Sequence, residues 1–249
     1  MITIKKPEEI ELMAQAGRIV AGCFGEIEEI LKPGVTTRQL DAKVNDYIKA
    51  NGGIAAFKGY GGYPANICVS INEEVVHGIP GEREISEADL VSVDIGVLKN
   101  GYYGDSARSY LLPPGDPEKE KLLEVTRKAL DKGIGMARAG NRLSDISFVI
   151  QDFVESYGYS VVRELVGHGI GKQMHEDPQI PNFGRPGNGP VLQPGMTLAI
   201  EPMVNIGTWK VETLEDKWTI VTKDKQPSAH FEHTIAITVN GPRILTIGN

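Results

Sequence analysis

Features that mark secreted, membrane-spanning or nucleic-acid-binding proteins are scarce in this sequence. It contains only two cysteines, Cys23 and Cys68, in 249 residues, too few for a disulfide framework or a cysteine-based zinc site. No run reaches the roughly 18 consecutive apolar residues of a membrane helix, and the opening MITIKKPEEIELM lacks the apolar region of a signal peptide. We therefore expect a soluble protein of a reducing compartment, the cytoplasm, with no membrane partner.

The charge balance is acidic, with 33 Asp and Glu against 26 Lys and Arg and a formal net charge of -7. Basic residues cluster no further than pairs such as Lys5-Lys6, so the sequence has no nucleic-acid-binding motif. With 41% hydrophobic and 24% charged residues, the composition is that of an ordinary globular protein. A chain of this length can bury a large core without disulfide bonds.

Helical and strand patterns alternate in an order that occurs twice. Apolar residues recur at helical spacing over 7–31 and again over 36–51, and both stretches precede strand-like runs. After Pro113-Pro114-Gly115 the order begins again, with amphipathic helices expected over 117–138 and within 141–158. At an offset of 106 residues, glycine and apolar positions of the two halves coincide: Gly34 with Gly140, Leu40 with Ile146, Val44 with Ile150 and Gly52 with Gly158. This pattern supports an internal duplication with halves of about 1–113 and 114–249.

The segment SVDIGVLKNGYYGDSARSY, residues 92–110, predicts a β-hairpin with a carboxylate in each arm. Asn100-Gly101 between two β-favouring runs is a strong signal for a two-residue turn. Such a turn places Asp94 opposite Ala107, so that Asp105 lies diagonally across from Asp94 on the same face. Two carboxylates this close share either a proton or cations. A one-residue slip in register would instead send them to opposite faces.

The second half has two comparable runs. MTLAIEPMV, residues 196–204, has Glu201 where the first half has Asp94, and HFEHTIAITV has Glu232 where the first half has Asp105. Asp and Glu are rarely buried unless they are paired or bind a metal. Four carboxylates in matching apolar strands therefore favour a metal site.

Three histidines lie in glycine-flanked turns near these strands. His168 and His175 occur in LVGHGIGKQMHEDP, which we interpret as a loop, and His77 ends the apolar run of EEVVHGIP. A histidine in such a place can also have a purely structural role. An oxygen-rich site with one imidazole suits Mn²⁺, Fe²⁺, Co²⁺ or Zn²⁺. Four carboxylates and one histidine suffice for two ions, whose chemistry is the hydrolysis of an amide or ester.

In order and context, the motifs SVDIG, GYYGDSAR, VGHGIG, AIEP and FEHT resemble those of type I methionine aminopeptidases of the bacterial form. The resemblance covers essentially the whole chain. It implies an α+β pita-bread fold, in which pseudo-two-fold duplicated halves surround a curved antiparallel sheet, as one catalytic domain over 1–249. It also implies removal of the initiator methionine from nascent polypeptides, near the ribosome, when the second residue is small, by a monomeric enzyme.

The resemblance further implies roles for individual residues. Asp94, Asp105, His168, Glu201 and Glu232 would hold two divalent ions (Co²⁺, Mn²⁺, Fe²⁺, Zn²⁺ or Ni²⁺), with Asp105 and Glu232 bridging them. His77 and His175 would contact the substrate, and Glu201 would also transfer a proton. The methionine pocket would be lined by Tyr60, Tyr63, Cys68, Met203 and Trp218, together with Phe57 and Met174, which depart from close bacterial relatives. Core packing is the alternative for Cys68 and Met203. Backbone carbonyls of Asn72 and Ser228 would hold a monovalent cation.

Three other functions share some of these features. A prolidase or aminopeptidase P would have the same five ligands, but usually with an additional N-terminal domain. A binding protein on an inactive scaffold would have lost ligands, whereas all five ligands and both other histidines are present here. A dimetal phosphoesterase would have Arg or Lys near the metals, and the flanking motifs are instead aromatic and glycine-rich.

Overall fold

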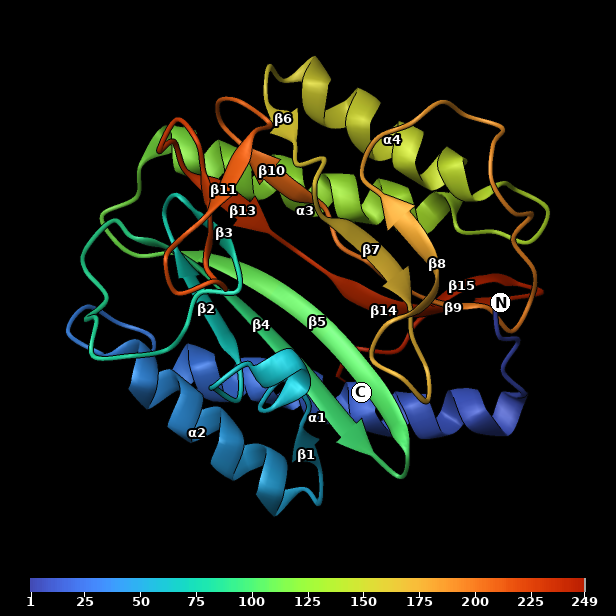
Figure 1. The fold of residues 1–249 in the computed structure, drawn as a ribbon, viewed down its shortest axis with the longest axis horizontal. Coiled ribbons are helices and arrows are strands. Elements are labelled where there is room, and N and C mark those ends of the chain that lie inside the picture. Colours follow the sequence, from blue (N-terminus) through green and yellow to red (C-terminus); the bar gives the residue numbers. More distant parts are fainter. Residues whose placement is uncertain (249) are drawn as a thin grey trace.

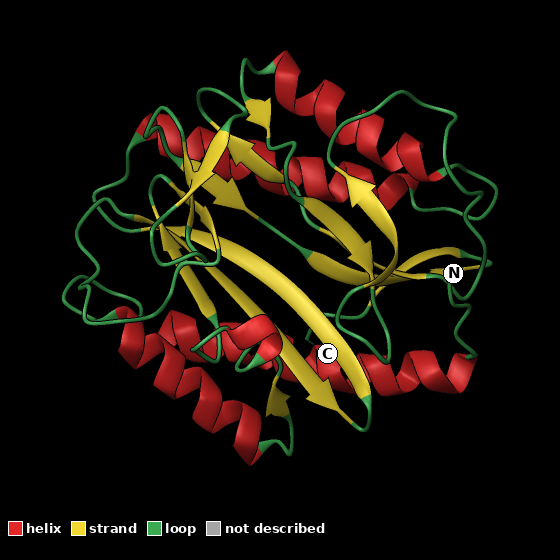
Figure 2. Ribbon diagram, viewed as in Figure 1, coloured by secondary structure: helices red, strands yellow, loops and turns green. Residues whose placement is uncertain are grey.

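Two pairs of helices lie on the outside of the molecule, and the strands lie between them (Figures 1 and 2). The computed structural model describes residues 1–248. The helices are α1 (Pro7–Ile30), α2 (Thr37–Ala50), α3 (Pro117–Met136) and α4 (Leu143–Ser156). Helix α1 ends one residue and helix α3 two residues before the predicted end, because the backbones of Leu31 and Ala137 are no longer helical. Within the described residues, no helix is both long and apolar enough to cross a bilayer.

The strands of the first half are β1 (Ile54–Ala55), β2 (Cys68–Ile71), β3 (Glu74–Val76), β4 (Leu90–Lys99) and β5 (Tyr102–Leu111), with a short 3₁₀ turn, η1, at Tyr60–Gly62. Those of the second half are β6 (Ser160–Val161), β7 (Val166–Gly169), β8 (Glu176–Pro181), β9 (Thr197–Ile200), β10 (Met203–Asn205), β11 (Val211–Thr213), β12 (Ile220–Thr222), β13 (Ser228–His230), β14 (His233–Thr238) and β15 (Gly241–Ile244). The pairing is antiparallel throughout: β1, β2 and β5 pair with β4, while β15, β14, β9, β7 and β8 form one sheet in that order. The α+β pita-bread class is thus confirmed.

The helices α2 and α4 show the duplication most clearly. Each begins with a capped turn; in α2 the Thr36 side chain accepts a hydrogen bond from the backbone N–H of Gln39 at 3.2 Å. Each buries apolar residues at matching positions, namely Leu40, Val44 and Ile48 in α2 and Ile146, Ile150 and Val154 in α4. The glycines at their ends also match: Gly52 and Gly158 have φ of 68° and 82°, a left-handed conformation that ends helices.

The hairpin β4–β5 has the predicted register. Lys99 pairs with Tyr102 and Asp94 with Ala107. Asn100 and Gly101 have φ of 51° and 78°, as a type I′ turn requires. Alternate residues of β4 (Val91, Val93, Ile95 and Val97) pack under α1 and α2 in one apolar cluster. Side chains alternate across a strand, so Asp94 faces the opposite side, toward the second half.

The two acidic residues of the second half differ from the prediction, because both lie just outside strands. Glu201 follows β9 and precedes Pro202, which has no N–H for a strand ladder, so β9 and β10 are separate strands. Glu232 lies between β13 and β14, and its N–H donates to the carbonyl oxygen of Ala107 at 3.0 Å. His168 was also expected in a loop, but it belongs to β7, while His175 lies in the turn before β8.

Candidate metal centre

A cavity of about 290 Å³ lies where the two halves meet. Its walls combine polar groups with aromatic side chains: Phe57, Tyr60, Tyr63, Cys68, His77, Asp94, Asp105, His168, His175, Glu201, Trp218 and Glu232. The structure therefore brings the five predicted ligands, the two other predicted histidines and most of the predicted pocket residues to one place. This convergence requires both halves.

The junction behind the cavity is held by hydrogen bonds between β5 and the start of β14. The Ser106 hydroxyl donates to the carbonyl oxygen of Glu232 at 2.5 Å. The backbone N–H of Asp105 donates to Oγ1 of Thr234 at 3.0 Å, and that hydroxyl donates back to the Asp105 carbonyl oxygen at 2.8 Å. These bonds fix the backbone of one acidic residue from each half at the same point.

The carboxyl groups lie in an environment that opposes their ionisation. Asp105 and Glu232 are buried, and Asp94 and Glu201 are half-buried. Burial raises the pKa of Asp94 to about 7. Burial and the neighbouring carboxylates raise the pKa of Asp105 and Glu232 well above their usual range, and burial and Asp94 do the same for Glu201. Four negative charges at this spacing repel one another, and cations would relieve that repulsion.

The donor atoms are arranged as divalent metal ligands would be. One oxygen or nitrogen each from Asp105, His168 and Glu232 lies within 4.8 Å of the others. Within residues 1–248, Oδ1 of Asp94, Oδ1 of Asp105 and Oε1 of Glu232 are buried without a hydrogen-bond partner. Buried carboxylate oxygens are normally paired or bound to metal. The residues present therefore fit divalent metal ions.

A hydrogen bond to the Gly169 backbone sets the tautomer of His168 that a metal ligand needs. Its Nδ1 lies 2.9 Å from the carbonyl oxygen of Gly169, which can only accept, so Nδ1 carries the proton and Nε2 has a free lone pair. Nε2 faces Oε1 of Glu201 at 3.5 Å. Burial and the nearby His175 lower the pKa of His168 to about 4, so the imidazole is neutral at pH 7.

His77 and His175 flank the cavity without belonging to that ligand group. His77 has a φ of 61°, a strained conformation for a side-chain-bearing residue, and burial lowers its pKa to about 4. Nδ1 of His175 forms a hydrogen bond of 2.7 Å with the hydroxyl of Tyr60, and its ring packs 4.3 Å from that of His168, centroid to centroid. Both imidazoles can therefore offer an N–H to a polar group in the cavity.

The other end of the cavity is aromatic. The rings of Tyr63 and Trp218 pack edge to face, with centroids 5.1 Å apart. The Tyr63 hydroxyl is turned away from the cavity, since it donates to the carbonyl oxygen of Gly78 at 2.9 Å. Cys68 pairs with Asp94 in register on β2 and β4, so its thiol borders both the carboxylate and the aromatic ends. This end suits an apolar side chain.

Two predicted pocket residues, Met174 and Met203, lie outside the set of described residues that line the cavity. Met174 is buried behind Phe57 and belongs to a cluster with Ile170 and Ala199. Met203 packs with Val75, Val76 and Val162. Both are core residues here, the alternative that the sequence left open for Met203. The two residues predicted to hold a monovalent cation, Asn72 and Ser228, are neighbours. The Asn72 carbonyl oxygen accepts a hydrogen bond from the N–H of Ser228 at 2.9 Å.

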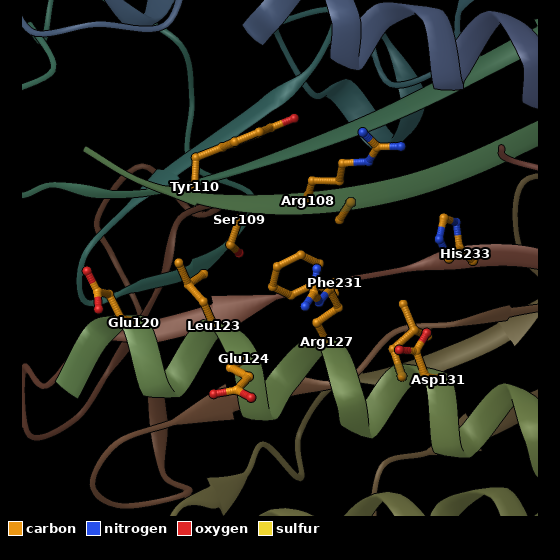
Figure 3. A pocket seen from close by; sticks show the side chains of 12 residues that line it. Arg108, Ser109, Tyr110, Glu120, Leu123, Glu124, Arg127, Asp131, Phe231 and His233 are labelled. Carbon is orange, nitrogen blue, oxygen red and sulfur yellow. The ribbon is translucent and has the colours of Figure 1, made fainter. Parts of the chain in front are cut away.

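A separate cavity of about 540 Å³ lies between β5, β14 and α3 (Figure 3). Arg108, Tyr110 and His233 line it. Nδ1 of His233 forms a hydrogen bond of 2.8 Å with the Thr246 hydroxyl. This cavity shares no lining residue with the acidic cavity among the described residues.

His230 was not among the predicted residues, although it lies beside the site. It is buried, and its Nε2 is 3.8 Å from Oε2 of Glu201. The sequence contained one signal for it: His230 precedes Glu232 by two residues, and in extended chain this spacing places both on one face.

Comparison with known proteins agrees with this geometry. The model of metallopeptidase family M24 matches residues 11–239. The methionine aminopeptidase of Clostridium acetobutylicum is 55% identical over 99% of both chains. The crystal structure of a methionine aminopeptidase from Thermotoga maritima superposes with a TM-score of 0.98 at 51% identity, covering 99% of this chain and 100% of that one.

A prolidase from Pyrococcus horikoshii shares the fold, with a TM-score of 0.80, but is 24% identical, and this chain covers 64% of it. The two methionine aminopeptidases thus match over essentially their whole length, and the prolidase over part of its length. The chain belongs to metallopeptidase family M24, and within it to the bacterial methionine aminopeptidases.

Proposed function

We propose that this enzyme removes the N-terminal initiator methionine from nascent polypeptides whose second residue is small. The observation that carries the proposal is that four carboxyl groups, two buried and two half-buried, lie together in the wall of a cavity of about 290 Å³ that also has aromatic walls. The acidic end suits hydrolytic chemistry, and the aromatic end suits an unbranched apolar side chain such as methionine. We propose that residues 1–249 act as one catalytic unit with two similar halves.

Two divalent ions would be held by five side chains: Asp94, Asp105, His168, Glu201 and Glu232. Asp105 and Glu232 would contribute to both ions. The candidate ions are Co²⁺, Mn²⁺, Fe²⁺, Zn²⁺ and Ni²⁺. Such ions supply an activated water for attack and polarise the scissile carbonyl group. The short separations within Asp105, His168 and Glu232 support this assignment. A titration that gives one ion per chain at full activity would contradict the dinuclear site.

The remaining polar residues would act on the substrate. His77 and His175 would donate hydrogen bonds to the peptide carbonyl oxygen as negative charge develops on it. The hydrogen bond between His175 and Tyr60 supports this role, because it orients the imidazole. Glu201 would accept the proton of the attacking water and pass it to the leaving amine. The methionine side chain would lie against Phe57, Tyr63, Cys68 and Trp218.

The test is a comparison of kcat/KM on Met-Ala-Ser, Met-Ile-Ser, Pro-Ala-Ser and Ala-Pro with metal-reconstituted protein. We expect Met-Ala-Ser to be cleaved far faster than Met-Ile-Ser. The reacting carbonyl must lie between the ligands and the two histidines, and a β-branched neighbour is stiff at χ1. A recombinant chain expressed with the start Met1-Ile2 should retain Met1, as its intact mass would show. Preferred cleavage of Ala-Pro would indicate a prolidase instead.

The cellular setting is part of the same proposal. The substrate is a newly made chain, so we propose a cytoplasmic monomer that acts near the ribosome. Sedimentation of a cell lysate through a density gradient tests this proposal. A fraction of the monomeric enzyme should co-sediment with ribosomes that carry nascent chains, and its absence from the ribosome fractions would contradict the proposal.

A further inference from the structure

His230 has a buried side chain whose imidazole is directed at the acidic cluster. The residue ends β13, where it pairs with Met203 of β10, and only 2% of its surface is exposed. Nε2 has no hydrogen-bond partner within residues 1–248. A buried N–H without a partner costs about 1–3 kcal/mol. A histidine with no role beyond packing would therefore lower the stability of the fold at this position.

The backbone of His230 is held from the first half of the molecule. Its N–H donates to Oγ of Ser109 at 3.0 Å, and the same hydroxyl donates to its carbonyl oxygen at 2.8 Å. Ser92 lies 2.7 Å from Ser109, oxygen to oxygen, so its hydroxyl can supply the remaining hydrogen bond. These contacts fix the backbone position from which the imidazole extends.

Glu201 lies between two imidazoles. Its Oε1 is 3.5 Å from Nε2 of His168, and its Oε2 is 3.8 Å from Nε2 of His230. His168 must keep Nε2 unprotonated because Nδ1 donates to Gly169. His230 can have the other tautomer and present an N–H to the carboxylate. Hydrogen bonds in catalytic sites are commonly long before substrate binds and shorten afterwards.

We infer that His230 is a positioning residue, which donates a hydrogen bond from Nε2–H to Oε2 of Glu201 and keeps Oε1 directed toward His168. This inference deepens the proposed function, because it assigns a group that orients the carboxylate proposed to transfer the proton. It acts through Glu201 and does not touch the substrate, since His230 lies outside the described residues that line the cavity.

The first test measures the histidine tautomers in the unsubstituted protein, and a substitution serves only to identify the signals. Two-bond ¹H–¹⁵N spectra of metal-free protein labelled in histidine distinguish the two neutral tautomers. We expect His230 to be protonated at Nε2 and His168 at Nδ1. The His230 signals are identified by their absence from His230→Gln. A His230 protonated at Nδ1 alone would overturn the inference, whether or not the enzyme cleaves peptides.

The second test compares His230→Leu, which removes the donor, with His230→Gln, which keeps an N–H of similar reach. Outer-shell partners of metal ligands typically change metal affinity or activity by about 10–100-fold. We expect such a loss in Mn²⁺ affinity and kcat for the leucine variant, with KM little changed, and a loss of less than about tenfold for the glutamine variant. Equal losses in both variants, or none in the leucine variant, would contradict the inference.

His233→Leu is the control, because it removes an imidazole one residue after Glu232 that lines the separate cavity between β5, β14 and α3 (Figure 3). We expect its Mn²⁺ affinity to stay within about tenfold of the parent, below the outer-shell range. Should His230→Leu fail to fold by circular dichroism, the tautomer measurement decides. Failure of the parent to cleave Met-Ala-Ser would refute the proposed function, while the tautomer and Mn²⁺ affinity would still decide the role of His230.

Discussion

The two halves of the molecule present their acidic residues in different ways. In the first half, Asp94 and Asp105 lie in the middle of long paired strands joined by a two-residue turn. In the second half, Glu201 and Glu232 lie at interruptions between strands, and four further strands, β10 to β13, separate them. A hairpin fixes two side chains through local pairing, whereas the second pair depends on contacts with the rest of the fold.

The largest expected effect comes from removing one bridging candidate from each half. Asp105→Ala and Glu232→Ala should each lower kcat/KM by more than about 100-fold, beyond the usual outer-shell range, because each removes a direct ligand. Metal content, by atomic absorption, should fall in both. Each metal-free variant should melt no lower than the parent, since a repelling carboxyl is gone. Full activity of either variant would break the equivalence of the two halves.

The pH dependence of metal binding distinguishes the carboxylate ligands, which must lose protons to bind metal, from the imidazole of His168, which is already neutral. The pKa of Asp94 is raised to about 7, and those of Asp105, Glu201 and Glu232 lie well above their usual range. In metal-free protein near pH 6 the Asp94 carboxyl is therefore mostly protonated, and the other three carboxyl groups ionise less readily than usual, so Mn²⁺ binding releases protons and strengthens as pH rises. His168, with a pKa of about 4, contributes none.

Calorimetry at pH 6 and pH 8 in buffers of different ionisation enthalpy measures this release. The apparent affinity should rise about tenfold per pH unit for each proton released. A constant affinity over this range would mean that the carboxyl groups of both halves are already ionised before metal binds.

The smallest effect concerns the turn that sets the first pair. Gly101→Val places a β-branched residue at a φ of 78°, which should cost about 1–2 kcal/mol of stability. We expect denaturant midpoints to fall while metal stoichiometry stays unchanged, because ten residue pairs between β4 and β5 still fix the register. Gly187→Val, at a φ of 80° in the second half, is the control for strain alone. Loss of metal in Gly101→Val only would show that the turn determines the register.

The parts of the site that could be predicted were those set by neighbouring residues. Asn100-Gly101 determines the turn, and the turn determines that Asp94 faces Ala107. Glycines and apolar residues at a constant offset were enough to indicate the repeated helices. Fold, family and activity followed from motifs that extend along the whole chain.

Other features depend on contacts that sequence does not display. The pattern of residues 196–204 predicts one strand, but Pro202 interrupts it after Glu201. The backbone partner of Glu232 is Ala107, 125 positions earlier. Met203 is apolar and near the cluster, yet only the packing of β10 shows that it faces the core. His230 was not predicted because its place beside Glu201 depends on a backbone position that Ser109 fixes from 121 residues earlier. The ligand roles themselves remain predictions that the metal measurements above address.

The hydrogen bond from Glu232 to Ala107 ties metal affinity to the association of the halves. Residues 1–113 carry Asp94 and Asp105, and the rest of the chain carries His168, Glu201 and Glu232, so neither half alone contains the cluster in which three donor atoms lie within 4.8 Å. Ligands that bind only the assembled state stabilise that assembly by mass action. Two separately expressed halves should therefore associate more tightly as the concentration of divalent ions increases, and the metal would act as a cross-link between two copies of one ancestral unit.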